Sequence, residues 1–413
     1  MTHLLKTFKM AARNLARNGR RTRSTIIAIV VGMVGLAFID GYVTYSMNGL
    51  TEATIKSGTG HLQIAASPAF YDEGDADPFP FMLRDAPALE RELRAMSEVD
   101  EVMPALSFTA VISTKGKTST VMVTALPVAT SKAKLEARRI AAGKDLDASD
   151  SGSILVGQGL AKKLGFAPGD SVSLFAQTKG GGINTQSYAI KGTTSTIIAA
   201  IDNVSVAMSL EDAKSLIGAD TVPQLIVFLK KTSETEAVVK RLKASAPPSA
   251  AAGLEVRSWD ELSPYFREAN SSYQMVLGVA KLIVLIVALF SISGTLSLSV
   301  LERFREIGSL RAFGTKRSGV LLMFVLEGLM LGAAGALAGV AVGIGATSLI
   351  NALGGIVMPP QPGTTTAFTI LFTPRSSGFA QNALFVLLAA ALGSILPGML
   401  SSRKTIAELL SSK

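Results

Sequence analysis

Four long apolar stretches constrain this chain more than any other feature of its sequence. The hydrocarbon core of a bilayer is about 30 Å thick, so a helix needs roughly 20 residues to cross it. The stretches cover residues 25–47, 272–300, 319–350 and 380–400. Because backbone polar groups in hydrocarbon must pair with one another, each stretch is predicted to form a transmembrane helix.

The basic side chains lie beside the predicted spans and not in the long segment between the first two. The formal net charge is +9, yet residues 48–271 hold 23 basic against 26 acidic side chains. Residues 1–23 carry seven basic and no acidic side chains, residues 301–318 five and two, and residues 401–413 three and one. Since cytoplasmic flanks are rich in Lys and Arg, both termini and residues 301–318 are predicted to be cytoplasmic. The basic excess therefore indicates a membrane protein in contact with lipid and no nucleic-acid partner.

The N-terminal segment is expected to be a retained anchor helix. It has the basic and apolar regions of a secretory signal, but "IDGYVTYSM", which follows the apolar run, lacks a small-x-small cleavage site. The predicted fold class is an α-helical membrane protein with four transmembrane helices and a large extracytoplasmic mixed α/β domain between spans one and two.

The exported segment reads as two small α/β lobes, with spans one and two continuing outward as a stalk. Pro168 and Gly169 suit a type II turn, and "KGGGIN" at 179–184 suits a second turn. Strands are predicted at 61–66, 107–114, 119–126, 153–157, 171–176, 195–201, 204–208 and 224–229, and helices at 86–96, 158–164, 210–217 and 235–244.

No catalytic or metal-binding pattern stands out. The chain has no cysteine and two histidines, which argues against thiolate and imidazole metal sites. Gly116-Lys117-Thr118 matches the end of a phosphate-binding loop, but Val111 stands where that loop needs glycine, so a hairpin turn is expected. The acidic run at 72–77 lacks the glycine turn and the terminal Glu of a calcium loop. We predict no catalytic residue, no metal and no cofactor bound by this chain.

The third apolar stretch contains glycines four residues apart, which let helices approach closely in lipid. The pattern fits packing against other spans of the same chain or a seam between two copies. The glycines are Gly328, Gly332, Gly335, Gly339 and Gly343. Three charged residues lie within the spans, and for them snorkelling or a helix-end partner is favoured over a proton relay. They are Asp40, Lys281 and Glu327.

Residues 301–318, "LERFREIGSLRAFGTKRS", form the most densely charged block of the chain. Apolar residues recur there every three positions, so they would drift around one straight helix. Gly308 and Gly314 are the expected breaks, giving a piece that ends at Ile307 and a bent piece at 309–313. A loop that only sets topology needs basic residues alone, so a docking element is expected, with Leu310 and Phe313 buried.

The same block resembles a known family. "ERFREIGSLRAFGTKRSGVLLMFVLEGLMLG" (302–332) is similar to the E-R-x-R-E-I-G-x-L-R-A-x-G-x-x-R…E stretch of the MacB/FtsX-type ABC transporter permeases. "ARNLARNGRRTRST" (12–25) and "SSRKTIAELLSSK" (401–413) resemble their cytoplasmic N-terminal and C-terminal helices. "GHLQI" (60–64), "SILVGQGLAKKLGFAPGDSVSLF" (153–175) and "VAMSLEDAKSLIG" (206–218) are similar to the lipoprotein-releasing LolC/LolE branch. Unlike MacB itself, the sequence carries no fused ATPase domain.

The resemblance implies a multi-pass protein of the bacterial inner membrane. The implied map is a cytoplasmic amphipathic N-terminal helix (1–24), transmembrane helices (25–47, 272–300, 319–350, 380–400), a MacB-like periplasmic core domain (48–271), a cytoplasmic coupling element (301–318), a periplasmic loop (351–379) and a cytoplasmic C-terminal helix (401–413).

It also implies partners and a mechanism. The chain would pair with a second permease chain, identical or related, and with a cytoplasmic ABC ATPase that binds ATP and Mg²⁺. Mechanotransmission would then extract lipoprotein or another amphiphile towards a periplasmic acceptor. The alternative is an FtsX-like subunit that activates a periplasmic partner without transport. The implied ATPase-coupling residues are Glu302, Arg303, Arg305, Glu306, Ile307, Gly308, Leu310, Arg311 and Gly314.

Overall fold

A computed structural model describes most of the chain. The described residues are 10–11, 13–14, 19–114, 116–129, 139–196, 199–244, 254–358, 368–405 and 408. The chain divides into two compact units, each treated by itself below. The helical unit draws on Met1–Asn48, Ala269–Met358 and Phe368–Lys413, and the α/β unit is formed mainly by Gly49–Glu268.

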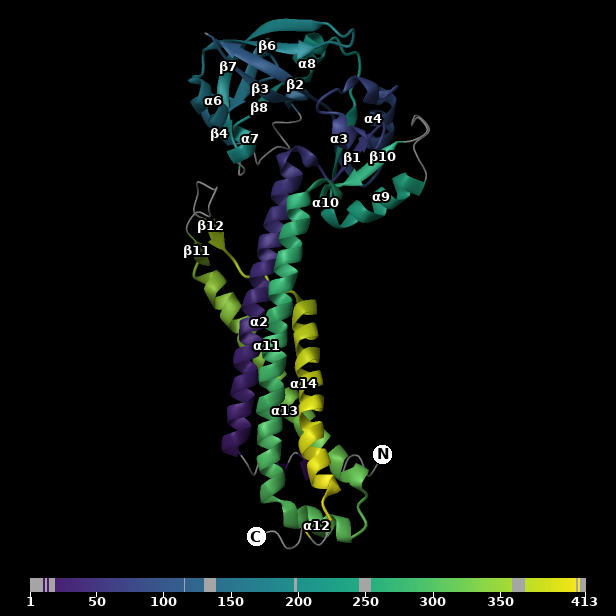
Figure 1. The fold of residues 1–413 in the computed structure, drawn as a ribbon, viewed down its shortest axis with the longest axis vertical. Helices are drawn as coiled ribbons and strands as arrows, with labels where there is room; N and C mark the ends of the chain where they lie inside the picture. The colour runs from purple at the N-terminus through teal and green to yellow at the C-terminus, as the bar shows by residue number, and fades with distance from the viewer. Residues whose placement is uncertain are drawn as a thin grey trace. The chain divides into compact units, whose positions relative to one another are not determined.

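Long helices dominate the helical unit (Figure 1). Among the described residues, four helices are long and apolar enough to cross a membrane, which confirms the predicted four-span fold class. Each extends beyond the apolar window expected from the sequence. The elements are α2 (Gly19–Thr54), α11 (Pro264–Glu302), α12 (Phe304–Ala312), α13 (Arg317–Ala352), β11 (Ile356–Met358), β12 (Phe368–Ile370) and α14 (Ser376–Arg403).

The core of the helical unit is a single apolar cluster to which α2, α11, α12, α13 and α14 all contribute. One polar contact lies beside it, between the hydroxyl oxygens of Thr25 and Thr295, 2.5 Å apart. The opposite faces of the long helices are apolar but exposed, as at Phe290 on α11 and Leu337 on α13. Such faces suit contact with lipid chains.

The α/β unit contains one path of paired strands, in the order β10-β1-β9-β2-β3-β8-β5-β7-β4, with β6 pairing β2 and β7. The long strand β2 joins two lobes, because its first half pairs with β9 and its second half with β3 and β6. The strands are β1 (Leu62–Ala65), β2 (Val99–Thr114), β3 (Lys117–Leu126), β4 (Arg139–Gly143), β5 (Ser153–Gly157), β6 (Ser171–Gln177), β7 (Ile183–Ser195), β8 (Ser205–Ser209), β9 (Gln224–Leu229) and β10 (Glu255–Ser258).

Short helices cover this sheet (Figure 1). The α-helices are α3 (Phe70–Glu73), α4 (Ala86–Arg94), α6 (Gln158–Leu164), α7 (Ala199–Asp202), α8 (Leu210–Ile217), α9 (Thr235–Ala244) and α10 (Trp259–Leu262). The helices of each lobe pack against buried side chains of the strands. Most of these buried side chains belong to one continuous core. The exported domain is therefore mixed α/β, as predicted.

The chain enters and leaves the α/β unit through strands that pair with each other. After α2, one π-helical turn, η1 (Ile55–Thr59), leads through Gly60 into β1. Strand β1 then runs antiparallel to β10, with Leu62 opposite Ser258, and the Trp259 N–H donates to the His61 carbonyl at 3.1 Å. Helix α11 follows soon after β10. The segments leading from α2 and into α11 are thus tied together by backbone hydrogen bonds.

Most predicted elements of the α/β unit are confirmed. The helices at 158–164, 210–217 and 235–244 and the strand at 153–157 have the predicted bounds. The type II turn is confirmed by Gly169, whose φ is +99°, and by the Asp170 N–H donating to the Ala167 carbonyl at 3.1 Å. Pairing of Thr114 with Lys117 confirms the hairpin, although Lys115 itself lies outside the described residues.

One strand prediction is wrong. The apolar run 195–201 was expected to be a strand, but β7 ends at Ser195 and α7 begins at Ala199. The Asp202 carboxylate accepts hydrogen bonds from the N–H and the hydroxyl of Thr196, which hold the residue after β7 against α7. The strand that precedes this turn, β7, was missed because its first half alternates polar side chains instead of apolar ones. Local side chain–backbone bonds competed successfully with strand propensity.

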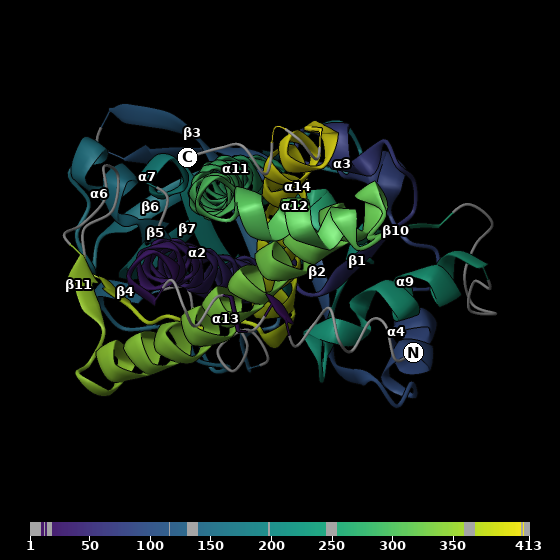
Figure 2. The same cartoon turned by 90° about the horizontal axis from the view of Figure 1, so that it is seen from below.

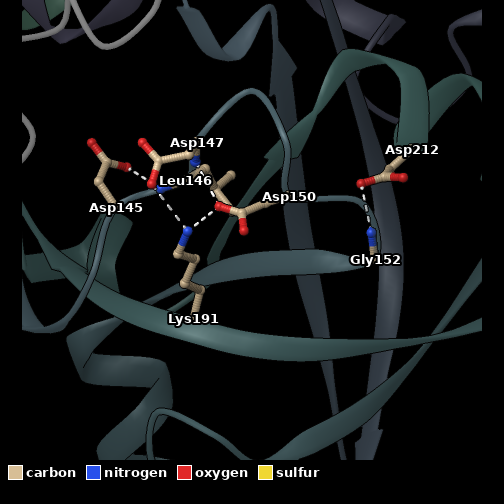
Figure 3. Close-up of polar contacts among 7 residues, drawn as sticks. All are labelled: Asp145, Leu146, Asp147, Asp150, Gly152, Lys191 and Asp212. Carbon is tan, nitrogen blue, oxygen red and sulfur yellow. Dashed lines mark hydrogen bonds and ion pairs between the residues drawn. The ribbon is translucent and has the colours of Figure 1, made fainter.

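An ion-pair cluster fixes the loop between β4 and β5 (Figure 3). The Lys191 ammonium on β7 contacts the carboxylates of Asp150 and Asp147, the latter at 3.4 Å. The Asp150 carboxylate also accepts the Asp147 N–H at 2.6 Å. Hydrogen bonding to Lys191 lowers the pKa of Asp150, and hydrogen bonding to Asp150 raises the pKa of Lys191. The loop is therefore held by a charged pair whose side chains are mostly buried.

Replacing Lys191 should lower the thermal stability of the full chain, but only across a defined pH range. The contribution of Asp150 to the free energy of unfolding is present above its unfolded pKa of about 3.9 and is lost as pH falls through its lower folded pKa. The contribution of Lys191 is present below its unfolded pKa of about 10.4 and is lost as pH rises through its higher folded pKa. We expect K191M to melt earlier than the unsubstituted chain at pH 7, and the difference to shrink as pH falls towards 2, measured by thermal unfolding in detergent. K179M, at an exposed ion pair with Asp220, is the control and should change little. An equal loss at both pH values would refute the assignment.

Candidate functional site

The charged block 301–318 forms a short helix that lies across the end of the long helices (Figure 2). The chain breaks at Arg303, where φ is −118° and ψ is 18°, between α11 and α12. Gly308 was expected to be a break, but it lies buried inside α12. Gly314 does end the segment: its φ is +94°, and the Thr315 N–H reaches the Leu310 carbonyl at 3.1 Å, as in a Schellman motif.

Arg303 is buried and joins two carboxylates. Its guanidinium Nη1 lies 3.0 Å from Oε1 of Glu327 on α13, and its Nε lies 2.9 Å from Oε2 of Glu306 on α12. The amide of Asn14 donates to the same Glu327 Oε1 at 2.6 Å. Glu327 is only 1% exposed, so it neither snorkels nor remains unpaired. The N-terminal segment, α12 and α13 therefore meet at one carboxylate.

Further contacts lie around α12 at the same end of the bundle. Glu302 accepts from Arg21 at 2.5 Å, which links the end of α11 to the first turn of α2. The Arg311 guanidinium donates to the backbone carbonyl of Lys404, just after α14. The Lys404 ammonium lies 4.1 Å from the centre of the Phe304 ring, a cation–π distance. Thus α12 contacts the segment that follows α14, while Glu302 ties the adjoining end of α11 to α2.

The outer surface of α12 is partly apolar. Ile307 and Gly308 face the bundle core, and Leu310 is half-buried. Phe313 was expected to be buried, but it is 91% exposed at the end of α12 beside Gly314. The error follows from placing a break at Gly308, because one continuous helix turns Phe313 outward. Arg305 also lies on the exposed surface. An exposed aromatic ring among basic side chains fits a protein-binding surface.

The glycines of α13 lie against helices of the same chain. A Cβ on Gly328 or Gly332 would meet Ser394 or Ala390 of α14 at 2.7 or 2.6 Å. A Cβ on the next three would meet side chains of α2: Ile29 at 2.7 Å for Gly335, Met33 at 2.5 Å for Gly339 and Ala37 at 3.1 Å for Gly343. The glycine pattern therefore brings α13 into backbone-close contact with both α14 and α2.

Asp40 lies at the start of α14. A Cβ on Gly378 would come within 2.3 Å of the Asp40 Oδ2, so this carboxylate sits against the first turn of a long helix, where unpaired N–H groups favour negative charge. This geometry matches the expected helix-end partner. Lys281 lies on α11, with its ammonium 5.7 Å from the centre of the Phe385 ring.

Comparison with known proteins gives two family matches. Residues 24–245 match the model of the MacB-like periplasmic core domain, and residues 278–406 match the FtsX-like permease C-terminal model. The core-domain match alone covers more than half of the chain.

Several curated proteins are similar. LolC, the lipoprotein-releasing system transmembrane protein of Neisseria meningitidis, is 26% identical over 46% of this chain and 47% of its own length. The MacB macrolide export ATP-binding/permease protein of Wolinella succinogenes is 24% identical over 86% of this chain and 55% of its length. An uncharacterised ABC transporter permease of Methanocaldococcus jannaschii is 24% identical over 83% of this chain and 84% of its own length. The chain spans about half the length, or less, of the first curated relatives it matches.

A solved structure is also similar. The periplasmic region of MacB from Actinobacillus actinomycetemcomitans aligns with a TM-score of 0.35 at 13% identity, over 50% of this chain and 91% of that one.

Enlarging a buried glycine of α13 should loosen the bundle. We expect G339L to destabilise the helical unit by about 1–3 kcal/mol, because Met33 of α2 occupies the space the side chain needs. Gly345 lies on the same helix with nothing within 4 Å of its Cβ position, so G345L is the matched control. The measurement is thermal unfolding in detergent. If both variants lost stability equally, close packing at Gly339 would not be the cause.

Proposed function

Because the chain belongs to the MacB/FtsX-type family of ABC transporter permeases, we propose that it converts ATP hydrolysis by a separate ATPase subunit into movement of its exported domain. The chain would lie in the bacterial inner membrane with both termini and α12 in the cytoplasm and the α/β unit in the periplasm. The distribution of basic residues supports this orientation. A second permease chain, identical or related, would complete the complex.

The ATPase would bind the exposed side of α12. Phe313 offers an aromatic anchor for an apolar pocket, and Arg305, exposed near the opposite end of α12, offers a charge for a carboxylate on the partner. Of the residues implied by the family motif, Arg303, Ile307 and Gly308 are buried within the chain. In this proposal they hold α12 in place, while the exposed residues make the contact.

Transmission rests on one observation: the chain enters and leaves the exported domain on paired strands. Strand β1 follows α2 and strand β10 precedes α11, and these two strands share a hydrogen-bonded ladder. Movement of either helix along its axis would therefore pull on one ladder at the edge of the sheet. The shared strand β2 would carry the displacement from that lobe to the other.

The proposed substrate is a lipoprotein or another amphiphile, taken from the membrane without an aqueous channel. The outward faces of the long helices are apolar, which suits a substrate that stays in contact with lipid. The printed name of the Neisseria relative, a lipoprotein-releasing protein, supports the same class. The alternative is an FtsX-like signalling role, in which the exported domain activates a periplasmic partner and nothing is transported.

Reconstitution separates the two roles. The chain, with the ABC ATPase that co-purifies with it from its native membrane, would be placed in proteoliposomes that carry a fluorescent triacylated lipoprotein. We expect ATP to release the lipoprotein into solution, whereas ADP does not. No release, combined with ATP-dependent activation of a cell-wall hydrolase, would replace transport with signalling.

Loss of the exposed anchor should weaken ATPase binding. We expect F313A to weaken binding by about 10- to 100-fold, because a buried aromatic anchor is the kind of residue that dominates an interface. Charge reversal at Arg305 and Arg311 should abolish co-purification while membrane insertion persists. Titration of the purified ATPase against the chain in nanodiscs measures the affinity. I183A, which removes an exposed apolar side chain in the α/β unit, is the control. Unchanged affinity of F313A would remove Phe313 from the docking surface.

A further inference from the structure

We propose that Glu327 is a positioning residue that fixes the coupling helix α12 to the third membrane helix, so that ATP-driven movement of α12 enters the bundle through α13 as well as through α11. This proposal rests on the proposed function. Its basis is the convergence of Arg303 and Asn14 on one carboxylate oxygen, at 3.0 and 2.6 Å.

The place of this contact along α12 gives it mechanical meaning. Arg303 stands at the break between α11 and α12, where the helical backbone is interrupted. The exposed anchor Phe313 stands at the opposite end of α12, which at nine residues is about 14 Å long. Force applied at Phe313 therefore acts on α12 as a lever arm with Arg303 near its pivot. Through Arg303, the pivot is attached to Glu327 in the first third of α13.

The contact carries force only because it is closed to water. Arg303 is 7% exposed and Glu327 is 1% exposed. Removing two charges from water costs about as much free energy as their mutual attraction returns. An apolar pair of similar volume would therefore hold the two helices together at least as well. An ion pair also fixes orientation. The Arg303 Nε contacts Glu306 on α12 and its Nη1 contacts Glu327 on α13, so the planar guanidinium sets how α12 is rotated against α13.

Asn14 makes the same carboxylate a junction for a third element. Its amide and the Arg303 guanidinium both donate to Oε1 of Glu327. A shift of either the N-terminal segment or α12 relative to α13 therefore changes the contacts of this oxygen. The pair on the exposed side, Glu302 with Arg21, also joins the end of α11 to the start of α2. Because its side chains are about half exposed, it contributes little to the rigidity of the junction.

The absence of cysteine in this sequence allows a direct test by site-specific spin labelling. Cysteines at Val31 on α2 and Leu349 on α13, both exposed, would carry the labels. The labelled chain in nanodiscs, bound to its ATPase, would be measured with and without ATP and vanadate. We expect a change in the Val31–Leu349 distance distribution in the unsubstituted background.

The decisive variant is E327Q, which keeps the oxygen acceptor but removes its charge. We expect the affinity for the ATPase to stay within about twofold, while the equilibrium constant of the ATP-driven shift falls by about 2- to 30-fold, the usual range for residues along a coupling path. N14A removes one of the two donors and should give a smaller loss in the same direction. E52Q makes the same chemical change at an exposed glutamate and should alter neither quantity.

The outcomes separate the two ideas. If the unsubstituted chain binds no ATPase or shows no ATP-driven shift, the proposed function fails and this inference fails with it. If that shift occurs and E327Q retains it in full, the proposed function stands and the role of Glu327 is refuted. If E327Q and N14A lose ATPase binding together with the shift, Glu327 only maintains the shape of the docking surface, and the inference is equally refuted. Should E327Q not fold, N14A decides by the same two measurements.

Discussion

Hydrocarbon offers no partner for a polar group, and the helical unit is organised around that constraint. Backbone groups are satisfied inside the helices, so the helices can associate only through close packing and a few paired side chains. The glycines of α13 supply the close packing against α14 and α2. Arg303 with Glu327, Thr25 with Thr295 and Asp40 at the start of α14 supply the paired polar groups. Helix α13 takes part in both kinds of contact, through its glycines and through Glu327.

The charged contacts of the helical unit lie around α12 and the adjoining ends of the long helices. Near the basic flanks, α12 is attached to α13 through the buried pair of Arg303 and Glu327 and to the segment after α14 through Arg311. At the other ends of these helices, α2 leads through η1 into β1, and β10 leads through α10 into α11; β1 and β10 are hydrogen-bonded to each other. Under the function proposed here, a rigid connection between these two places is needed more than a passage between the helices.

Much of the fold could be predicted from the sequence, because its signals are local. Apolar length identified the four spans, and periodicity with turn residues gave most strands and helices of the α/β unit. The break in the charged block could not be predicted in this way. Glycine spacing suggested Gly308, but the break lies at Arg303, where a side chain pairs with Glu327 twenty-four positions along the chain. Exposure of Phe313 was also not predicted, because the prediction placed a break at Gly308, whereas α12 runs unbroken through it.

The α/β unit was harder to predict where polar groups decide the backbone. Residues 195–201 look like a strand by composition. The Thr196 hydroxyl instead donates to the Asp202 carboxylate, β7 ends at Ser195 and α7 begins at Ala199. Strand β7 carries polar side chains on its outer face, so its alternation does not stand out by hydropathy. The candidate site was found because its charge density is unusual for a loop between two spans. The contacts within the site, such as that between Arg303 and Glu327, could not be predicted because they join residues far apart in the sequence.

The position of β1 has a consequence for how the exported domain folds. Its two neighbours in the sheet are β9 and β10, which are made only after almost all of the domain has been synthesised. Both edges of β1 therefore stay open through most of translocation, and closing them requires pairings at very long sequence separation, which form slowly. The first lobe can be completed only as the second membrane helix emerges. Assembly of this lobe is therefore completed shortly before α11 is made, so a chain truncated before β9 would leave both edges of β1 unpaired and open to aggregation.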